Sequence, residues 1–534
     1  MTHPYIKTLL QAVTLEEKEQ NNRFGSNGVQ SLKIMKAEGL ALHPISVTRK
    51  NFGYADYPEI TFRLRFQVET MYFRDGAAIE CFYGTEEPVK GVLLNLEGKT
   101  GEFRLFAPDF PDWIEEEGVG IKLAPDHRTT GIMKTVLREL ESKPFEKSLF
   151  EYLHDGVIPK NYEEPVTSET LHFTNGRLNE SQQKAVIAIT QNSLVTIVHG
   201  PPGTGKTTTL IEAVLQLINA GEKVLVSAPS NAAVDHFAKG LIKQGVKILR
   251  IGNTSKVDEL VFNHTPEGKL AGTQQKEIKQ LRIRAEEFRR MALKYKRSFG
   301  KSEREQRNLL FKEVKNIRIE IKKLRAYNED KLYETAEVIL GTPVGLYDAG
   351  MQKLNFKTLI IDEAGQCIEP LAWCIFPLAK KIVLAGDHWQ LPPTVLSNDA
   401  AALGLNNSIL EVAISHVKNV HLLDTQYRMR ESIAGFSGEY FYKGLLRTAK
   451  HLNNLGVHLT FIDTAGSGYN EEQGSEGVSL QNEGELRIAQ KIIGTENIDS
   501  LKSAFISPYS AQAAKAKELL PKEMRVSTID SFQG

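Results

Sequence analysis

The chain has 534 residues, too many for a single domain of roughly 100–200 residues, so several domains are expected. Hydrophobic residues make up 41% of it and charged residues 25%, which is ordinary for a soluble globular protein with a sizeable core. Lysine and arginine number 66, as do aspartate and glutamate, so no overall positive charge indicates a nucleic-acid partner, and any such signal must be local.

The chain has three cysteines, Cys81, Cys367 and Cys374, which are too few and too scattered for a disulfide framework. Cys367 and Cys374 lie in an apolar stretch, where buried core thiols are a better interpretation than zinc ligands. The sequence contains neither an uncharged apolar stretch of about 18 residues nor a signal-peptide core, so we expect no membrane partner. A reducing compartment, the cytoplasm, fits these features best.

The N-terminal part of the chain reads as helix, then strands, then helix. Residues 1–24 predict a helix because apolar residues recur at helical spacing. Up to about residue 125 the pattern changes: apolar and polar residues alternate over 60–68, and short strands are predicted at Val92–Leu96 and Phe103–Phe106. Short strands without intervening helices indicate a small β-barrel. Residues 130–153 return to a helical pattern.

From about residue 178, short apolar strands alternate with helices, which is typical of parallel strands covered on both faces. The runs expected to form these strands are Leu194–Val198, Lys223–Val226, Val338–Leu340, Thr358–Ile361 and Lys381–Leu384. A second such pattern starts after about residue 415, with expected strands at Val420–Leu423, Leu459–Ile462, Ser503–Ile506 and Arg525–Ile529. The predicted fold class is therefore α/β.

Residues 254–331 interrupt this pattern. Apolar residues step by three and four on both sides of Gly300, which predicts an antiparallel helical hairpin with a coiled-coil seam. The segment holds 21 Lys and Arg residues against 12 Asp and Glu residues. A solvated helix face and a contact with nucleic acid or another partner both remain open as explanations of this excess.

A phosphate-binding loop directly follows the strand Leu194–Val198 and precedes a helix. The loop reads His199-Gly200-Pro201-Pro202-Gly203-Thr204-Gly205-Lys206-Thr207-Thr208 and contains the pattern G-x-x-x-x-G-K-T. Its glycines let backbone N–H groups surround a phosphate at the helix N-terminus. We expect Lys206 to reach the β- and γ-phosphates and Thr207 to place its hydroxyl on Mg²⁺.

A pair of adjacent carboxylates, Asp362 and Glu363, ends the strand Thr358–Ile361. Asp362 is suited to hold Mg²⁺, and Glu363 is suited to orient and deprotonate the attacking water. Acidic residues are common at strand ends, so the pair by itself is weak evidence of a catalytic site. It becomes strong evidence because it follows the phosphate-binding loop within one α/β pattern. Together the two motifs predict ATP or GTP binding.

With these motifs in place, the chain resembles the Upf-type (class B) helicases of superfamily 1 over essentially its whole length. The further segments that carry the resemblance, in the family's order, are Leu178–Gln182, Ser227–Asp235, Gly386–Pro393, Gln426–Met429, Ser507–Tyr509 and Thr528–Gly534. Most have a structural explanation when taken singly; Ser230, for instance, also fits a helix N-cap, and Tyr427 a core aromatic. Their common order and spacing leave little room for coincidence.

The resemblance implies a role for each matching residue. The implied catalytic residues are Lys206, Asp362, Glu363, Gln390 and Arg428. The implied ATP contacts are Gln182, which would read adenine, residues 200–208, Tyr427, Arg428 and Gly534. The implied contacts with nucleic acid are Pro229, Ser230, Asn231, Thr342, Pro343, Pro508, Tyr509 and Thr528.

The family layout also implies the domain organisation: two tandem RecA-like domains, a β-barrel on a helical stalk, and an inserted hairpin. The expected parts are a stalk helix (1–24), the barrel (25–128), a second stalk helix and linker (129–160), the first RecA-like domain with the ATP site (161–253 and 332–415), the basic hairpin (254–331) and the second RecA-like domain (416–534). The family's next motif, with a second arginine for the γ-phosphate, would follow Gly534. The sequence therefore suggests a shortened second domain with poor turnover of its own.

The function that the resemblance implies is ATP-dependent 5′→3′ movement along single-stranded RNA or DNA, by a monomer that uses ATP and Mg²⁺. One alternative is an ATP-switched single-strand clamp or nucleoprotein remodeller that does not unwind duplexes. Another is an ATPase that remodels proteins. Strand displacement on a tailed duplex distinguishes the first alternative, and the response of ATP turnover to single strands distinguishes the second.

Overall fold

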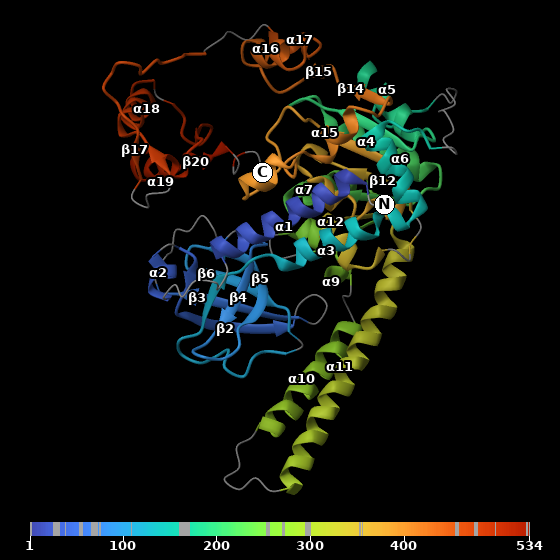
Figure 1. Ribbon diagram of the computed structural model, residues 1–534, viewed down its shortest axis with the longest axis vertical. Coiled ribbons are helices and arrows are strands. Elements are labelled where there is room, and N and C mark those ends of the chain that lie inside the picture. Colours follow the sequence, from blue (N-terminus) through green and yellow to red (C-terminus); the bar gives the residue numbers. More distant parts are fainter. Residues whose placement is uncertain are drawn as a thin grey trace. The chain divides into compact units, whose positions relative to one another are not determined.

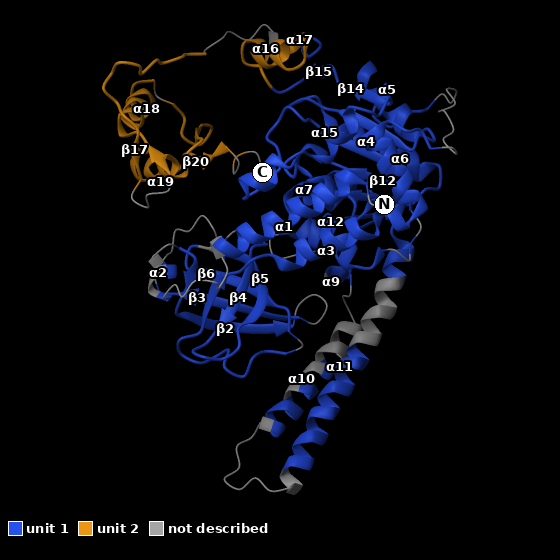
Figure 2. Cartoon of the chain, viewed as in Figure 1, with its two compact units in different colours: residues 1–428, 445–447 blue, residues 429–444, 448–534 orange. Residues whose placement is uncertain are grey.

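A computed structural model gives the fold of the chain, which forms two compact units (Figure 2). Unit 1 comprises residues 1–428 and 445–447, and unit 2 comprises residues 429–444 and 448–534. The structure describes residues 3–24, 32–37, 39–52, 57–65, 73, 76–107, 109–159, 171–252, 257–269, 273–293, 301–351, 354, 356–453, 459–474, 479–496, 498–529 and 532. Among them, no helix is long and apolar enough to cross a membrane.

An antiparallel sheet of seven strands forms the N-terminal part of unit 1 (Figure 1). The strands, which lie in the order β1-β7-β4-β5-β6-β3-β2, are β1 (Ala41–Leu42), β2 (Ile45–Phe52), β3 (Pro58–Leu64), β4 (Ala78–Phe82), β5 (Val89–Glu97), β6 (Thr100–Leu105) and β7 (Gly120–Leu123). The expected alternation is present in β3, where Ile60, Phe62 and Leu64 point into the core. Residues 66–68 of the predicted strand lie outside the described residues. The ladders of the described residues form an open sheet with β1 and β2 at its two ends.

Helices connect this sheet to the remainder of unit 1. They are α1 (Pro4–Phe24), α2 (Leu32–Ala37), α3 (His127–Glu139) and α4 (Pro144–Asp155). The single helix expected over 130–153 is interrupted between α3 and α4, because Pro144 disfavours helical backbone at Lys143, which is extended at φ −109° and ψ 118°. On α1, the buried Glu16 accepts hydrogen bonds from the backbone N–H groups of Leu396 and Ser397 at 2.9–3.2 Å. Helix α1 is thereby bonded to the segment that follows Gly386–Pro393.

A parallel sheet of seven strands forms the centre of unit 1, in the order β10-β11-β9-β12-β13-β8-β14. Its strands are β8 (Val195–His199), β9 (Val224–Ser227), β10 (Ile248–Arg250), β11 (Val338–Gly341), β12 (Phe356–Ile361), β13 (Ala379–Gly386) and β14 (Val420–Leu422). Its helices are α5 (Glu180–Thr190), α6 (Lys206–Asn219), α7 (Asn231–Lys243), α12 (Pro343–Asp348), α13 (Glu369–Ala372), α14 (Asn398–Ala402) and α15 (Ile409–Ile414). Both faces are covered: in β9, Leu225 packs into one apolar core, whereas Val224 and Val226 pack into the other. The predicted core thiols Cys367 and Cys374 are buried and free.

One strand expected in the second lobe belongs to this first sheet. β14 pairs in parallel with β8, so residues 420–422 lie in unit 1 and not at the start of a separate sheet. Asn419 explains this position, because its carbonyl accepts from the Ile197 N–H at 2.9 Å and its side chain donates to Ser193 and Thr196. These bonds hold the strand against the sheet edge that β8 would otherwise expose.

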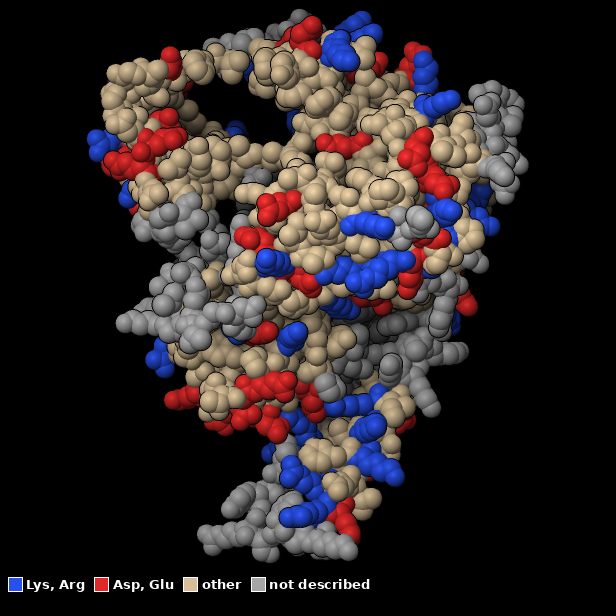
Figure 3. Space-filling model, in the orientation of Figure 1, with Lys and Arg blue, Asp and Glu red and all other residues tan. Residues whose placement is uncertain are grey.

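The insertion between β10 and β11 contains α8 (Glu259–Phe262), α9 (Pro266–Lys269), α10 (Thr273–Leu293) and α11 (Lys301–Thr335). The two long helices lie side by side (Figure 1). They pack through a small apolar cluster made of Leu281, Ala285, Phe288, Ile317 and Ile321. Arg289 of α10 donates to Asp112 and to the Phe110 carbonyl, both at 3.0 Å, which joins the hairpin to the loop after β6. Lysine and arginine gather over the described part of the hairpin (Figure 3), and its exposed basic residues include Arg284, Arg290, Arg304, Arg307, Lys312 and Lys315.

Unit 2 contains short strands and helices: α16 (Glu431–Tyr440), α17 (Lys450–Asn453), β17 (Glu472–Gln473), β18 (Leu480–Gln481), α18 (Glu483–Thr495), β19 (Ala504–Ser507), α19 (Ser510–Leu519) and β20 (Arg525–Thr528). β19 and β20 pair in parallel, as their α/β pattern predicts. Leu486, Ala516, Leu520 and Met524 form its small core. The strand predicted at Leu459–Ile462 is not formed: these residues have no strand structure, and Phe461 is 88% exposed.

Candidate ATP site

The phosphate-binding loop lies at the carboxyl end of the parallel sheet, where ligands of open α/β sheets bind. It connects β8 to α6. In the sheet β13 lies next to β8, and β12 lies next to β13, so the segments that follow β12 and β13 lie beside the loop. Two of its glycines adopt left-handed backbone, Gly203 at φ 77° and Gly205 at φ 76°. A Cβ atom on Gly203 would lie 2.6 Å from the Arg428 Cβ, so this position accepts no larger residue without movement of the chain.

Lys206 begins α6, and its ammonium group lies beside the predicted acidic pair. Its Nζ donates to Glu363 Oε1 at 2.9 Å and lies 3.9 Å from Asp362 Oδ1. Burial alone would lower the pKa of Lys206, but the charges of Asp362 and Glu363 outweigh burial and raise it. Burial raises the pKa of the Asp362 carboxyl to about 6, with Lys206 acting in the opposite direction. A phosphate offers Lys206 the same negative oxygens as Glu363, so the lysine can exchange one for the other.

Glu363 has a left-handed backbone at φ 54°, which is unfavourable for a residue with a side chain. Strain of this kind costs on the order of 1–3 kcal/mol and concentrates at functional sites. The Glu363 N–H donates to Asp362 Oδ1 at 2.9 Å, so the turn holds the two carboxylates in a fixed relation. Asp362 itself is anchored, since its N–H donates to the Ser227 carbonyl at 2.8 Å.

Asp362 and Thr207 fit a hard divalent cation such as Mg²⁺. The Asp362 side chain is 5% exposed, and its Oδ2 has no hydrogen-bond partner among the described residues. A carboxylate oxygen and a hydroxyl are the ligand types that Mg²⁺ prefers, usually completed by water and phosphate oxygens. Thr207 is the second residue of α6 and partly exposed, next to Lys206.

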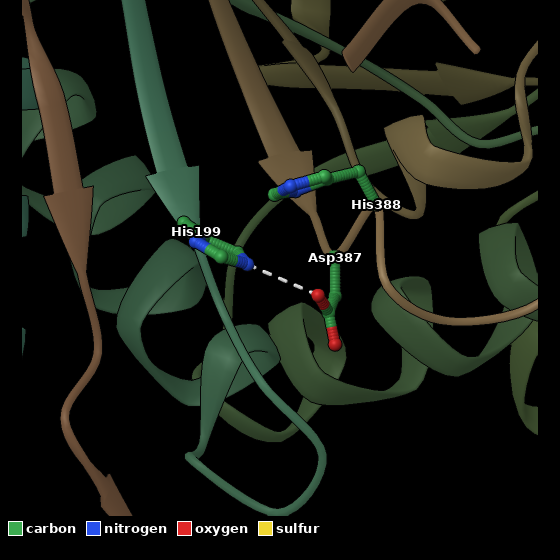
Figure 4. A group of neighbouring side chains, drawn as sticks. All are labelled: His199, Asp387 and His388. Atoms are coloured by element: carbon green, nitrogen blue, oxygen red, sulfur yellow. Dashed lines mark hydrogen bonds and ion pairs between the residues drawn. The ribbon is translucent and has the colours of Figure 1, made fainter. Parts of the chain in front are cut away.

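Asp387, directly after β13, hydrogen-bonds to the Gln390 side chain and faces His199 (Figure 4). Its Oδ1 lies 3.0 Å from His199 Nε2, and its Oδ2 accepts from Gln390 Nε2 at 2.9 Å. His199, Asp387 and His388 each offer one ligand atom within 4.8 Å of the others, an arrangement that a metal ion accepts. Hydrogen bonds to both Asp387 oxygens account for the positions of His199 and Asp387 without an ion, whereas His388 Nδ1 is buried and has no hydrogen-bond partner among the described residues.

The predicted adenine and γ-phosphate contacts lie against the same loop. The Tyr427 N–H donates to the Gly203 carbonyl at 2.8 Å, and the Arg428 N–H donates to Gln426 Oε1 at 2.9 Å. We expected Tyr427 and Arg428 on the second lobe, whereas the structure groups both with the phosphate-binding loop in unit 1. Gln182 is buried, with its Oε1 accepting from the Asn179 N–H at 2.9 Å and its Nε2 donating to the Thr204 carbonyl at 3.0 Å. Gly534 lies outside the described residues.

The predicted contacts with nucleic acid fall into two groups. In unit 1, Pro229, Ser230, Asn231, Thr342 and Pro343 follow β9 and β11, which are adjacent strands. Ser230 caps α7 and Thr342 caps α12, so both residues stand at helix N-termini. In unit 2, the remaining contacts lie at the carboxyl ends of β19 and β20: Pro508, Tyr509 and Thr528.

Three buried polar residues at this edge of the sheet have no role that the sequence predicts: His199, Asp387 and Arg250. His199 and Asp387 lie within predicted motifs, but their partnership joins positions 188 residues apart. Arg250 interrupts the apolar run Ile248–Ile251, and an arginine inside such a run was the available signal.

Two family models, both described as an AAA domain, match residues 177–398 and 405–534. The rat DNA-binding protein SMUBP-2 is 31% identical over 99% of the chain and 57% of its own length. The ATP-dependent helicase upf1 of Schizosaccharomyces pombe is 30% identical over 75% of the chain and 45% of its own length. The chain belongs to the Upf-type superfamily-1 helicases.

Members of this family are nucleic-acid-dependent ATPases with two RecA-like domains, in agreement with the phosphate-binding loop of unit 1. The chain spans about half the length of the curated relatives it matches. A solved structure of the PRRSV helicase is 12% identical over 95% of the chain and 63% of its own length, with a TM-score of 0.30.

Proposed function

We propose that the chain is the motor core of a helicase that hydrolyses ATP to move 5′→3′ along single-stranded RNA or DNA. The observation that carries the proposal is the cluster of Lys206, Asp362 and Glu363 at the carboxyl end of the sheet, where Lys206 Nζ lies 2.9 Å from Glu363. The direction of movement rests on family membership alone.

In the proposed reaction, Lys206 leaves Glu363 and binds the β- and γ-phosphates of ATP. Glu363, freed from the lysine, accepts a proton from water as the water oxygen bonds to the γ-phosphorus and the bond to the β–γ bridging oxygen breaks. Mg²⁺, held by Thr207 and Asp362, would neutralise phosphate charge when bound. Gln390 and Arg428 contact the γ-phosphate, and Tyr427 and Gln182 contact the base.

Nucleic acid would bind across the carboxyl ends of β9 and β11, at the helix N-termini capped by Ser230 and Thr342. Backbone N–H groups and the helix dipole favour phosphate oxygens there, so recognition should depend little on base sequence. In unit 2, Pro508, Tyr509 and Thr528 are proposed as further contacts with the strand. Gln390, the phosphate-binding loop, Ser230 and Thr342 all follow strands of the same sheet. ATP binding and strand binding can therefore influence one another.

The antiparallel sheet and the basic hairpin are proposed as accessory parts of this motor. The sheet would correspond to the β-barrel that Upf-type helicases carry on a helical stalk. The exposed arginines and lysines of α10 and α11 support a contact of the hairpin with the sugar–phosphate backbone.

The test is equilibrium binding of a fluorescent ATP analogue and of single-stranded RNA and DNA, followed by ATP turnover with and without each strand. We expect Lys206→Ala to lose ATP binding and wild type to bind both ligands. Strand displacement on duplexes with a 5′ or a 3′ tail then measures direction. ATP binding without affinity for any single strand would overturn the proposal in favour of a protein-remodelling ATPase, and displacement only with a 3′ tail would overturn the polarity.

A further inference from the structure

Arg250 is a fully buried arginine at the carboxyl end of β10, and its side chain is 0% exposed. Its Nε donates to Asp235 Oδ1 at 2.8 Å, and its Nη2 donates to Asn231 Oδ1 at 3.0 Å. Asp235 and Asn231 lie one turn apart on α7, so one guanidinium bonds to two side chains at the start of that helix.

The chemistry of the guanidinium fixes the orientation of the Asn231 amide. A guanidinium stays charged in proteins and carries only donors, so it can pair with the amide oxygen of Asn231 and not with the NH₂ group. Turning the amide over would place donor against donor next to a buried charge. The NH₂ group of Asn231 is therefore the end that points away from Arg250.

That NH₂ group has no partner among the described residues, and Asn231 is partly exposed at the N-terminus of α7. Ser230, the residue before it, caps the helix with its own hydroxyl, and the Ala233 N–H occupies that oxygen at 3.2 Å. The Ser230 hydroxyl still has its own proton to donate, so both side chains offer donors at the proposed strand-binding edge, and those of Asn231 are the ones whose orientation Arg250 fixes.

We infer that Arg250 is a positioning residue that sets the Asn231 NH₂ group as a hydrogen-bond donor to a backbone oxygen of the bound single strand. This inference rests on the proposed function, since it names the residue that orients one of its strand contacts. Arg250 itself touches no strand; it acts through Asn231.

The test compares three variants by fluorescence anisotropy with a short single-stranded oligonucleotide, and by thermal unfolding. Asn231→Asp keeps an acceptor for Arg250 and replaces the NH₂ donors by an oxygen. We expect its strand affinity to fall about 10- to 100-fold, the usual effect of losing a charge-assisted hydrogen bond, with no loss of thermal stability. Asn231→Ala also lacks the donors, without adding charge, and should lose strand affinity to a similar degree.

Arg250→Lys keeps the positive charge but not the fork of donors, so the Asn231 amide is free to turn and strand affinity should fall a few-fold. A purely structural role for Arg250 predicts instead lower thermal stability with unchanged strand affinity, which would overturn the inference. Affinity lost in Asn231→Asp but retained in Asn231→Ala would trace the effect to charge and overturn it equally. If wild type binds no strand, the proposed function fails; if wild type and all three variants bind alike, only the inference fails.

Discussion

The substitution Glu363→Gln tests the ion pair and the proposed base together. In the structure Lys206 Nζ lies 2.9 Å from Glu363 Oε1, with the lysine side chain 11% and the glutamate side chain 32% exposed. A partly exposed pair of this kind contributes about 1 kcal/mol. Because ATP must displace Glu363 from Lys206, loss of the carboxylate charge should tighten ATP binding by up to roughly fivefold.

Hydrolysis should change in the opposite direction, because a neutral amide cannot accept the proton of the attacking water. General-base catalysis contributes typically 10²–10⁴-fold, so single-turnover hydrolysis should slow by about that factor. The assay combines equilibrium binding of a fluorescent ATP analogue with single-turnover hydrolysis under excess enzyme. Glu334→Gln, an exposed glutamate at the end of α11, is the matched control and should behave as wild type. Hydrolysis by Glu363→Gln within threefold of wild type would refute the assignment of the base.

Three further predictions concern helix α1, the hairpin and the dependence of stability on pH. Glu16→Ala removes the acceptor of the Leu396 and Ser397 N–H groups, so the free energy of unfolding of unit 1 in urea should fall by about 1–3 kcal/mol; an unchanged midpoint would contradict this. Deleting 270–328 should weaken single-strand binding and flatten its dependence on salt, whereas unchanged binding would make the hairpin a spacer. Burial lowers the pKa of His421 from 6.5, so the unfolded chain takes up the proton first and stability should fall as pH drops below about 6.5. His421→Gln should reduce that slope in urea titrations at several pH values; an identical slope would exclude His421 as its source.

The sequence predicted best what depends on short stretches of chain. The phosphate-binding loop, the acidic pair and the apolar strands around them are local patterns, and β8, β9, β11, β12 and β13 formed within a few residues of the predicted bounds. Parallel strands buried on both faces leave a continuous apolar run, which is readable without knowledge of the partners.

What the sequence did not show depends on pairing between distant residues. β14 carries an apolar run like any other strand, and only its bonds through Asn419 place it beside β8. The run at Leu459–Ile462 is also largely apolar but has no strand structure, since apolar composition alone does not supply a neighbouring strand. Arg250 is a single residue whose partners Asn231 and Asp235 lie on another element, so no spacing rule could identify it.

Helix α11 has a mechanical consequence for the sheet from which it extends. It runs for 35 residues, about 52 Å at 1.5 Å per residue, and its last turn is held where Lys223 Nζ donates to the Tyr333 carbonyl at 2.6 Å. After two intervening residues the chain enters β11, and Thr342 directly follows the far end of that strand. A helix of that length is a lever: a tilt of about 5° at its base moves its tip by roughly 4–5 Å. A shift of β11 too small to disturb the sheet is thus magnified along α11 as far as the bonds of Arg289 to Asp112 and Phe110 allow, and a fluorophore on α11 would report it.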